Sequence, residues 1–300
     1  MKRSVIVMLI ATFISYCTKP GDVTLPPYEA RLALHGYVAV GDTFKIALGK
    51  TMKLDALQPP DSTYVTNGWM VLYDNNGFLD SLKYNANERM YVSGRVVAVS
   101  GKSYRVRAGA LGFPEVEATA VAPFPIPTVS LSHSKGTRRT AGNILLDDVK
   151  FSFNDPAAEN NFYLAALYGT NGSSCVFTYD PSVEKYTENL VPFDNGSCID
   201  NEQILFTDKT FNGKLKELTL STYSTSLMPY TDPSSGAVYR PYLKRYHITE
   251  EYYRYFKTAI NQDQVFEEGP MLTDPRTAKG NVRNGYGLFT VFAVVTDSVR

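Results

Sequence analysis

Apolar and polar residues alternate along much of the chain, which is the period of a β-strand with one buried face. Leu32, Leu34, Val38 and Val40 are the clearest example. The turn Asp74–Gly77 lies between two apolar runs and predicts a hairpin, because Asn and Gly tolerate positive φ. Roughly six or seven short strands fit before residue 122, which is the size and spacing of an immunoglobulin-like sandwich.

Three alternating prolines between residues 122 and 127 interrupt this pattern. Proline is excluded from central strands, so we expect a stiff linker over 123–128. A helix is predicted from residue 250, because Thr249 can cap it and two glutamates suit its positive end. The sequence therefore predicts a mainly β protein, with an immunoglobulin-like sandwich over 29–122 and a larger domain over 129–300. We expect that second domain to be a β-rich sandwich or barrel-like structure with one or two short helices.

The N-terminus has the pattern of an export signal. Lys2 and Arg3 precede an apolar run over 5–14. This run has the length of a signal-peptide core and is shorter than the roughly 20 apolar residues that span a bilayer. We therefore expect export to the cell envelope.

Cys17 ends this segment as the lipidated cysteine does in a bacterial lipoprotein signal. Ile14 and Ser15 fit the residues usual before that cysteine, whereas Tyr16 is bulky where a small residue is usual. We predict a lipoprotein signal peptide over 1–17, with Cys17 lipidated, and a Pro/Gly-rich tether over 18–28.

The charge of the mature chain is close to zero. Lys2 and Arg3 lie in the signal, which leaves 28 basic against 30 acidic residues. This balance provides no basic field for nucleic acid, so no nucleic-acid partner is expected. Apolar content of 44% and charged content of 20% are typical of a globular chain.

Two cysteines remain after lipidation of the first. Cys175 and Cys198 both lie in turns rich in Gly, Ser and Asn. In an oxidising compartment the pair would close a loop of roughly two dozen residues, a constraint worth about 3 kcal/mol. We predict this disulfide; the alternative is two free, partly exposed thiols.

Candidate catalytic and metal-binding motifs are weak. Ser132 and Lys135 match the S-x-x-K spacing of serine acyl-enzymes, but they follow an apolar strand and not a helix start. The histidines are isolated from one another and from the cysteines, so no zinc pattern exists. The acidic groupings lack EF-hand spacing. We therefore expect no catalytic residue, no metal and no cofactor.

Tyrosines are concentrated in one stretch of the second domain. Eight of them fall between residues 223 and 255, interleaved with arginine and lysine. Tyrosine provides contact area at low entropy cost, so this stretch is a candidate surface for a glycan, peptide or partner protein. The alternative is that these rings pack the core and a covering helix. The residues chosen for this candidate surface are Tyr239, Arg240, Tyr242, Arg245 and Tyr246.

Three segments of the second domain occur in a family-like order. They are ILFTDKTFNGK at 204–214, EEYYRYFKT at 250–258 and GNVRNGYGLF at 280–289. MVLYDNNGFL at 70–79 and GKSYRV at 101–106 extend the likeness to the first domain. On these motifs the chain resembles the DUF4249 family of Bacteroidota envelope lipoproteins. The resemblance implies an envelope lipoprotein beside TonB-dependent outer-membrane transporters, and it brings no established ligand or catalytic residue.

These observations favour a non-enzymatic outer-membrane lipoprotein, on a face that the sequence does not assign. Its expected role is that of an accessory or binding component of a TonB-dependent nutrient uptake system, held to the membrane by its N-terminal lipid. The first alternative is a structural or adhesive surface protein. The second is an enzyme of unknown type.

Overall fold

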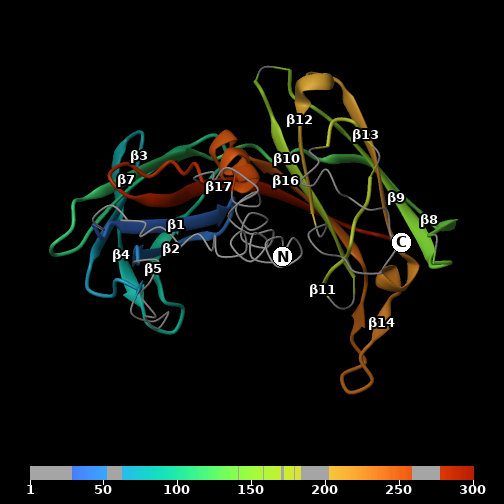
Figure 1. Cartoon of the computed structure of the whole chain (residues 1–300), viewed down its shortest axis with the longest axis horizontal. Coiled ribbons are helices and arrows are strands. Elements are labelled where there is room, and N and C mark those ends of the chain that lie inside the picture. Colours follow the sequence, from blue (N-terminus) through green and yellow to red (C-terminus); the bar gives the residue numbers. More distant parts are fainter. Residues whose placement is uncertain are drawn as a thin grey trace, which may run out of the picture.

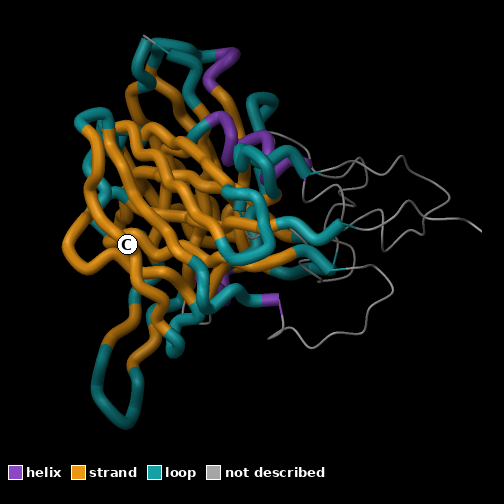
Figure 2. Tube along the Cα trace, turned by 90° about the vertical axis from the view of Figure 1, so that its left-hand side faces the viewer, coloured by secondary structure: helices purple, strands orange, loops and turns teal. Residues whose placement is uncertain are grey.

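The computed structural model describes residues 29–52, 63–140, 142–157, 159–169, 172–178, 180–183, 203–258 and 278–300. Strands make up most of this part of the chain, as Figure 2 shows, so the predicted mainly β class is confirmed. One α-helix is described, over 250–258. No helix in the described ranges is long and apolar enough to cross a membrane. Cys17 and Cys198 lie outside the described residues.

The first lobe consists of seven strands around one core (Figure 1). The predicted hairpin is confirmed: Asp74 pairs with Gly77, Gly77 has φ +121°, and the Asn76 amide donates to Asp74 Oδ1 at 2.8 Å. The arrangement is sandwich-like, because buried side chains from strands on both sides of the lobe pack into the same core. The strands are β1 (Leu32–Ala39), β2 (Thr43–Lys50), β3 (Trp69–Asp74), β4 (Gly77–Asn85), β5 (Met90–Val97), β6 (Ser103–Gly109) and β7 (Val116–Val121).

The second lobe packs two sheets face to face around an aromatic core. Phe153 contacts Tyr163 at a ring-centroid distance of 5.0 Å, and Tyr163 stacks on Phe206 at 5.2 Å. One sheet has the order β13-β9-β8. The elements of this lobe are β8 (Thr128–Arg139), β9 (Leu145–Asn154), β10 (Phe162–Gly169), β11 (Gly172–Ser173), β12 (Ile204–Thr207), η2 (Asp208–Thr210), β13 (Leu215–Tyr223), η3 (Ser224–Leu227), β14 (Tyr230–Thr231), β15 (Val238–Tyr239) and β16 (Tyr242–Ile248).

The last strand, β17 (Tyr286–Ser298), belongs to both lobes. Residues 286–292 pair in parallel with β1, and residues 293–298 pair antiparallel with β16. A single twelve-stranded sheet therefore runs through the molecule. Residues 286–292 thus lie in the sheet of the first lobe, and the expected division into 29–122 and 129–300 stays a prediction.

The glycine-rich segment around the start of β17 lets this strand approach β1 and β7 closely. Gly287 has φ +109°, and a Cβ added there would overlap the carbonyl oxygen of Leu34. Asn281 fixes the same seam, since its Nδ2 donates to Phe289 O at 2.8 Å and its Oδ1 accepts from Phe289 N at 2.9 Å. This part of the GNVRNGYGLF motif therefore has a structural role, since it joins β17 closely to its neighbours.

Candidate binding surface

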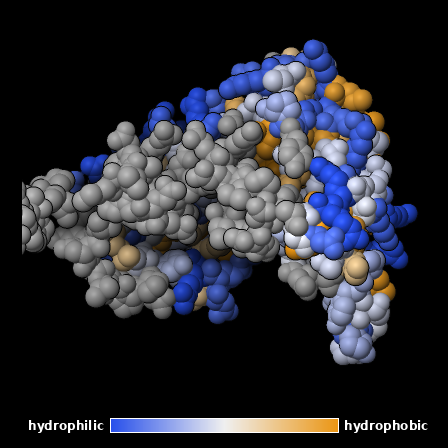
Figure 3. Space-filling view, turned by 45° about the vertical axis from the view of Figure 1, so that its right-hand side comes forward, coloured by the Kyte–Doolittle hydropathy of each residue, from blue (hydrophilic) through white to orange (hydrophobic). Residues whose placement is uncertain are grey.

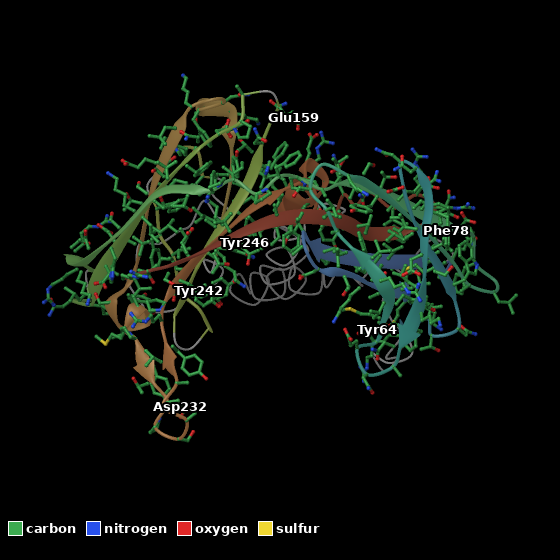
Figure 4. All side chains as sticks on the ribbon, turned by 180° about the vertical axis from the view of Figure 1, so that it is seen from behind. Tyr64, Phe78, Glu159, Asp232, Tyr242 and Tyr246 are labelled. Carbon is green, nitrogen blue, oxygen red and sulfur yellow. The ribbon has the colours of Figure 1, made fainter. Side chains whose placement is uncertain are left out.

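Aromatic side chains form a continuous row on the outer face of the large sheet, which we define as the face turned away from the cores of the two lobes. A third, smaller hydrophobic cluster lies on this face beneath the helix, and Tyr246, Tyr252 and Phe292 pack against it. The row, here called the aromatic stripe, crosses β1, the helix, β17, β16 and β10. The ring centroids of Tyr37 and Tyr252 lie 5.6 Å apart. Phe292 lies 6.3 Å from Tyr252 and 5.7 Å from Tyr246, measured between ring centroids. Figure 4 shows Tyr242 and Tyr246 along the middle of the sheet. The members of the stripe are Tyr37, Tyr252, Phe292, Tyr246, Tyr168 and Tyr242.

The two ends of the stripe differ in their surroundings. At one end Tyr37 is 44% exposed and packs against Tyr252 of the helix. At the other end Tyr168 and Tyr242 are cross-strand partners whose rings stack at 5.0 Å with an interplanar angle of 9°. The Lys244 ammonium lies 5.2 Å and 5.7 Å from their two ring centroids, within the range of a cation–π contact.

Burial raises the pKa values of three phenols of the stripe. Desolvation, and then the adjacent Tyr168 hydroxyl, raise the pKa of Tyr246, and the two hydroxyl oxygens are 3.4 Å apart. Burial also raises the pKa values of Tyr37 and Tyr252. The three side chains differ in what they offer a ligand, since Tyr37 is exposed whereas Tyr246 and Tyr252 pack against the cluster beneath the helix.

Tyr239 lies elsewhere, on a two-stranded hairpin formed by β14 and β15. Its ring is 53% exposed and stacks on Tyr230 at 6.2 Å. The hairpin projects from the second lobe (Figure 3), and Asp232 lies in its terminal loop (Figure 4). Asp232 accepts hydrogen bonds from Ser234 and Ser235, which lower its pKa to about 2. Arg240 is exposed and follows β15 directly.

The expectation that Arg245 belongs to this surface is wrong. Arg245 is 3% exposed and lies on the inner face, with its guanidinium 4.4 Å from the ring centroid of Phe153. It donates to Ile126 O and to Thr128 Oγ1, and burial lowers its pKa to about 10. The physical reason is the two-residue period of a strand, which places Tyr242, Lys244 and Tyr246 on one face and Arg245 on the other.

Arg245 and His247 attach the proline-rich linker to β16. His247 Nδ1 donates to Phe124 O at 2.9 Å, while Arg245 donates to Ile126 O. His247 also stacks on Tyr163 at 5.4 Å, and burial lowers its pKa. The sequence predicted the linker without predicting these contacts, since side chains about 120 residues further along provide them.

The weak catalytic motif of the sequence lies on an edge strand. Ser132 and Lys135 belong to β8, which has one strand partner in the sheet order. Between them, His133 Nε2 lies 2.8 Å from Asp147 Oδ2, and Asp147 Oδ1 accepts from Gly136 N and the Ser224 hydroxyl. The carboxylate lies between His and Ser, whereas a nucleophilic triad needs the imidazole between them.

The remaining predicted residues are cysteines and acidic groups. Cys175 is 7% exposed, and its predicted partner Cys198 lies outside the described residues, so the disulfide stays a prediction. Asp155 accepts hydrogen bonds from Tyr163 and from Gly213 N. The acidic grouping at 194–202 also lies outside the described part. Within the described ranges, no three His, Cys, Asp or Glu residues gather as metal ligands would.

Comparison with known proteins assigns a family and no activity. The family model described as "Domain of unknown function (DUF4249)" matches residues 18–298. No curated protein matches the chain significantly. The match spans nearly all of the chain beyond its first 17 residues and includes both lobes of the structure. The chain therefore belongs to the DUF4249 family.

Proposed function

We propose that this protein is a lipid-anchored envelope protein and a non-enzymatic binding component of a TonB-dependent outer-membrane uptake system. The observation that carries the proposal is the N-terminal sequence, in which a basic start and a short apolar run end at Cys17. The aromatic stripe supports the binding role. It presents ring faces and hydroxyls, which are suited to holding a nutrient near a transporter.

A lipid anchor would raise the effective concentration of the binding surface near membrane partners. Buried acyl methylenes contribute about 0.8 kcal/mol each, so a multiply acylated cysteine holds the chain firmly at a bilayer. The tether 18–28 reaches at most roughly 40 Å when fully extended. The folded body therefore stays close to membrane partners, and this closeness raises their effective concentration.

Two further parts of the proposal concern the cysteines and the alternatives. We propose that Cys175 and Cys198 form a disulfide, as expected of an exported chain. The rival role is that of a structural or adhesive surface protein, for which the projecting Tyr230–Tyr239 pair is the favouring observation. Binding to host or matrix surfaces without a transporter partner would identify that role.

Membrane fractionation tests the anchor. The substitution Cys17→Ser should move the protein from the membrane fraction into the soluble fraction, whereas Ser15→Ala, which keeps the lipid acceptor, should leave it in the membrane. Mass spectrometry of the mature N-terminus should find the acyl groups on Cys17. Unchanged membrane retention of the Cys17→Ser variant would contradict the proposal.

A further inference from the structure

The Tyr168–Tyr242 end of the stripe combines three kinds of recognition group in one small area. The two rings are nearly parallel, and the Lys244 ammonium lies over both. The hydroxyl of Tyr168 lies 3.4 Å from that of Tyr246. A ligand at this place meets apolar ring surface, hydroxyl groups and one positive charge.

The backbone beneath these side chains is already paired. β16 lies between β10 and β17, and β10 has β16 on one side with β11 and β12 on the other. An extended peptide therefore finds no free strand edge here to which it could add. Recognition at this patch has to come from side chains alone.

The positive charge of the patch favours a negatively charged ligand. The outward positions of β10, β16 and the second half of β17 contain a single charged residue, Lys244, and no carboxylate. Within the described residues Lys244 has no acidic ion-pair partner. An anionic group brought to the ring pair would thus meet a complementary charge, and the outward positions of these three described strands contribute no opposing carboxylate. The residues at these outward positions are Phe162, Leu164, Ala166, Tyr168, Tyr242, Lys244, Tyr246, Ile248, Phe292, Val294, Thr296 and Ser298. Leu164, Ala166 and Ile248 among them are buried, whereas Tyr168, Tyr242 and Lys244 are half-buried.

We propose that this patch is a subsite for an acidic sugar, that is, a pyranose ring bearing a carboxylate. The C–H face of the sugar packs on the Tyr168 and Tyr242 side chains, its hydroxyls bond to the phenols, and its carboxylate pairs with Lys244. A sugar suits the patch better than an acidic peptide does, because it needs no backbone partner. This assignment rests on the proposed binding function and names the class of nutrient that the protein would hold.

The test compares an acidic disaccharide with its uncharged methyl ester. Digalacturonate and its dimethyl ester have nearly the same shape, so their difference in affinity measures the carboxylate contribution. Titration of the full mature chain in detergent, followed by NMR or calorimetry, should show digalacturonate binding about tenfold or more tightly, as expected for a charge-assisted contact. Lys244→Met should remove this preference and leave ester binding unchanged. Lys83→Met, at an exposed lysine of the first lobe, should change neither affinity.

Several results would overturn the assignment. They are no binding of digalacturonate at millimolar concentration, equal binding of acid and ester, and a preference that survives Lys244→Met. Tight binding of a penta-glutamate peptide that depends on Lys244 would assign the patch to acidic peptides instead. Each of these results leaves membrane anchoring and partner binding untouched, since fractionation and co-purification measure those separately.

Discussion

Gly287 is the described glycine with positive φ at which an added methyl group would meet the closest neighbour. It lies at the start of β17, in the parallel pairing with β1, where Leu34 is opposite Gly287. Its φ of +109° disfavours any residue with a side chain, and an added Cβ would overlap the Leu34 carbonyl oxygen. Gly287→Ala therefore combines backbone strain with a steric collision inside a central strand.

The expected loss of stability has two parts. Placing alanine at this φ costs about 1–3 kcal/mol. Separating β17 from β1 to admit the methyl group costs about 1–3 kcal/mol more, as in other overpacked sites. The sum of about 2–6 kcal/mol is a large fraction of the about 5–15 kcal/mol by which domains are stable.

Two other glycines separate these contributions. Gly41 has φ +95° with nothing within 4 Å of an added Cβ, so Gly41→Ala should cost the strain alone. Gly94 has neither a positive φ nor a close neighbour, so Gly94→Ala should change the free energy of unfolding by about 0.5 kcal/mol or less. Urea denaturation followed by circular dichroism measures all three. A Gly287→Ala variant as stable as Gly94→Ala would show that the pairing of β17 with β1 tolerates a side chain at this position.

Three other outcomes are expected. Arg245→Met should destabilise the protein by about 1.5–3 kcal/mol in urea denaturation, because it removes buried hydrogen bonds of a charged group, whereas Lys244→Met should be nearly neutral; equal effects would contradict the burial of Arg245. Burial lowers the pKa of His35, so the unfolded chain binds a proton at a higher pH than the folded chain does. The free energy of unfolding should therefore fall as the pH drops below about 6.5. His35→Gln should reduce this pH dependence, and an unchanged pH dependence would exclude His35 as its source. Mass spectrometry of unreduced protein should find Cys175 and Cys198 protected from alkylation, and modification of both thiols would reject the disulfide.

Local signals in the sequence predicted local structure well. The Asp74–Gly77 turn forms the expected hairpin. The helix begins at residue 250 after Thr249, whose Oγ1 accepts a hydrogen bond from Tyr252 N at 3.2 Å. These features depend on neighbouring residues, whose conformational preferences are visible in the sequence itself.

Long-range pairing could not be predicted in the same way. Nothing in the β17 sequence indicates that its first half pairs with β1 and its second half with β16, because alternation fixes the faces of a strand without fixing its partners. For the same reason, the tyrosine-rich stretch predicted Tyr242 and Tyr246 but missed Tyr37, Tyr168 and Phe292, which distant strands contribute. The burial of Arg245 is different, since the two-residue period of its own strand already implied it.

The proposed function makes the protein an anchored partner of an outer-membrane transporter. Affinity purification of the tagged, lipidated protein from solubilised native membranes tests this claim most directly, with an unrelated tagged lipoprotein as the control. We predict that a TonB-dependent transporter co-purifies with this protein and is absent from the control. Recovery of the same proteins in both samples, or of this protein alone, would contradict the claim.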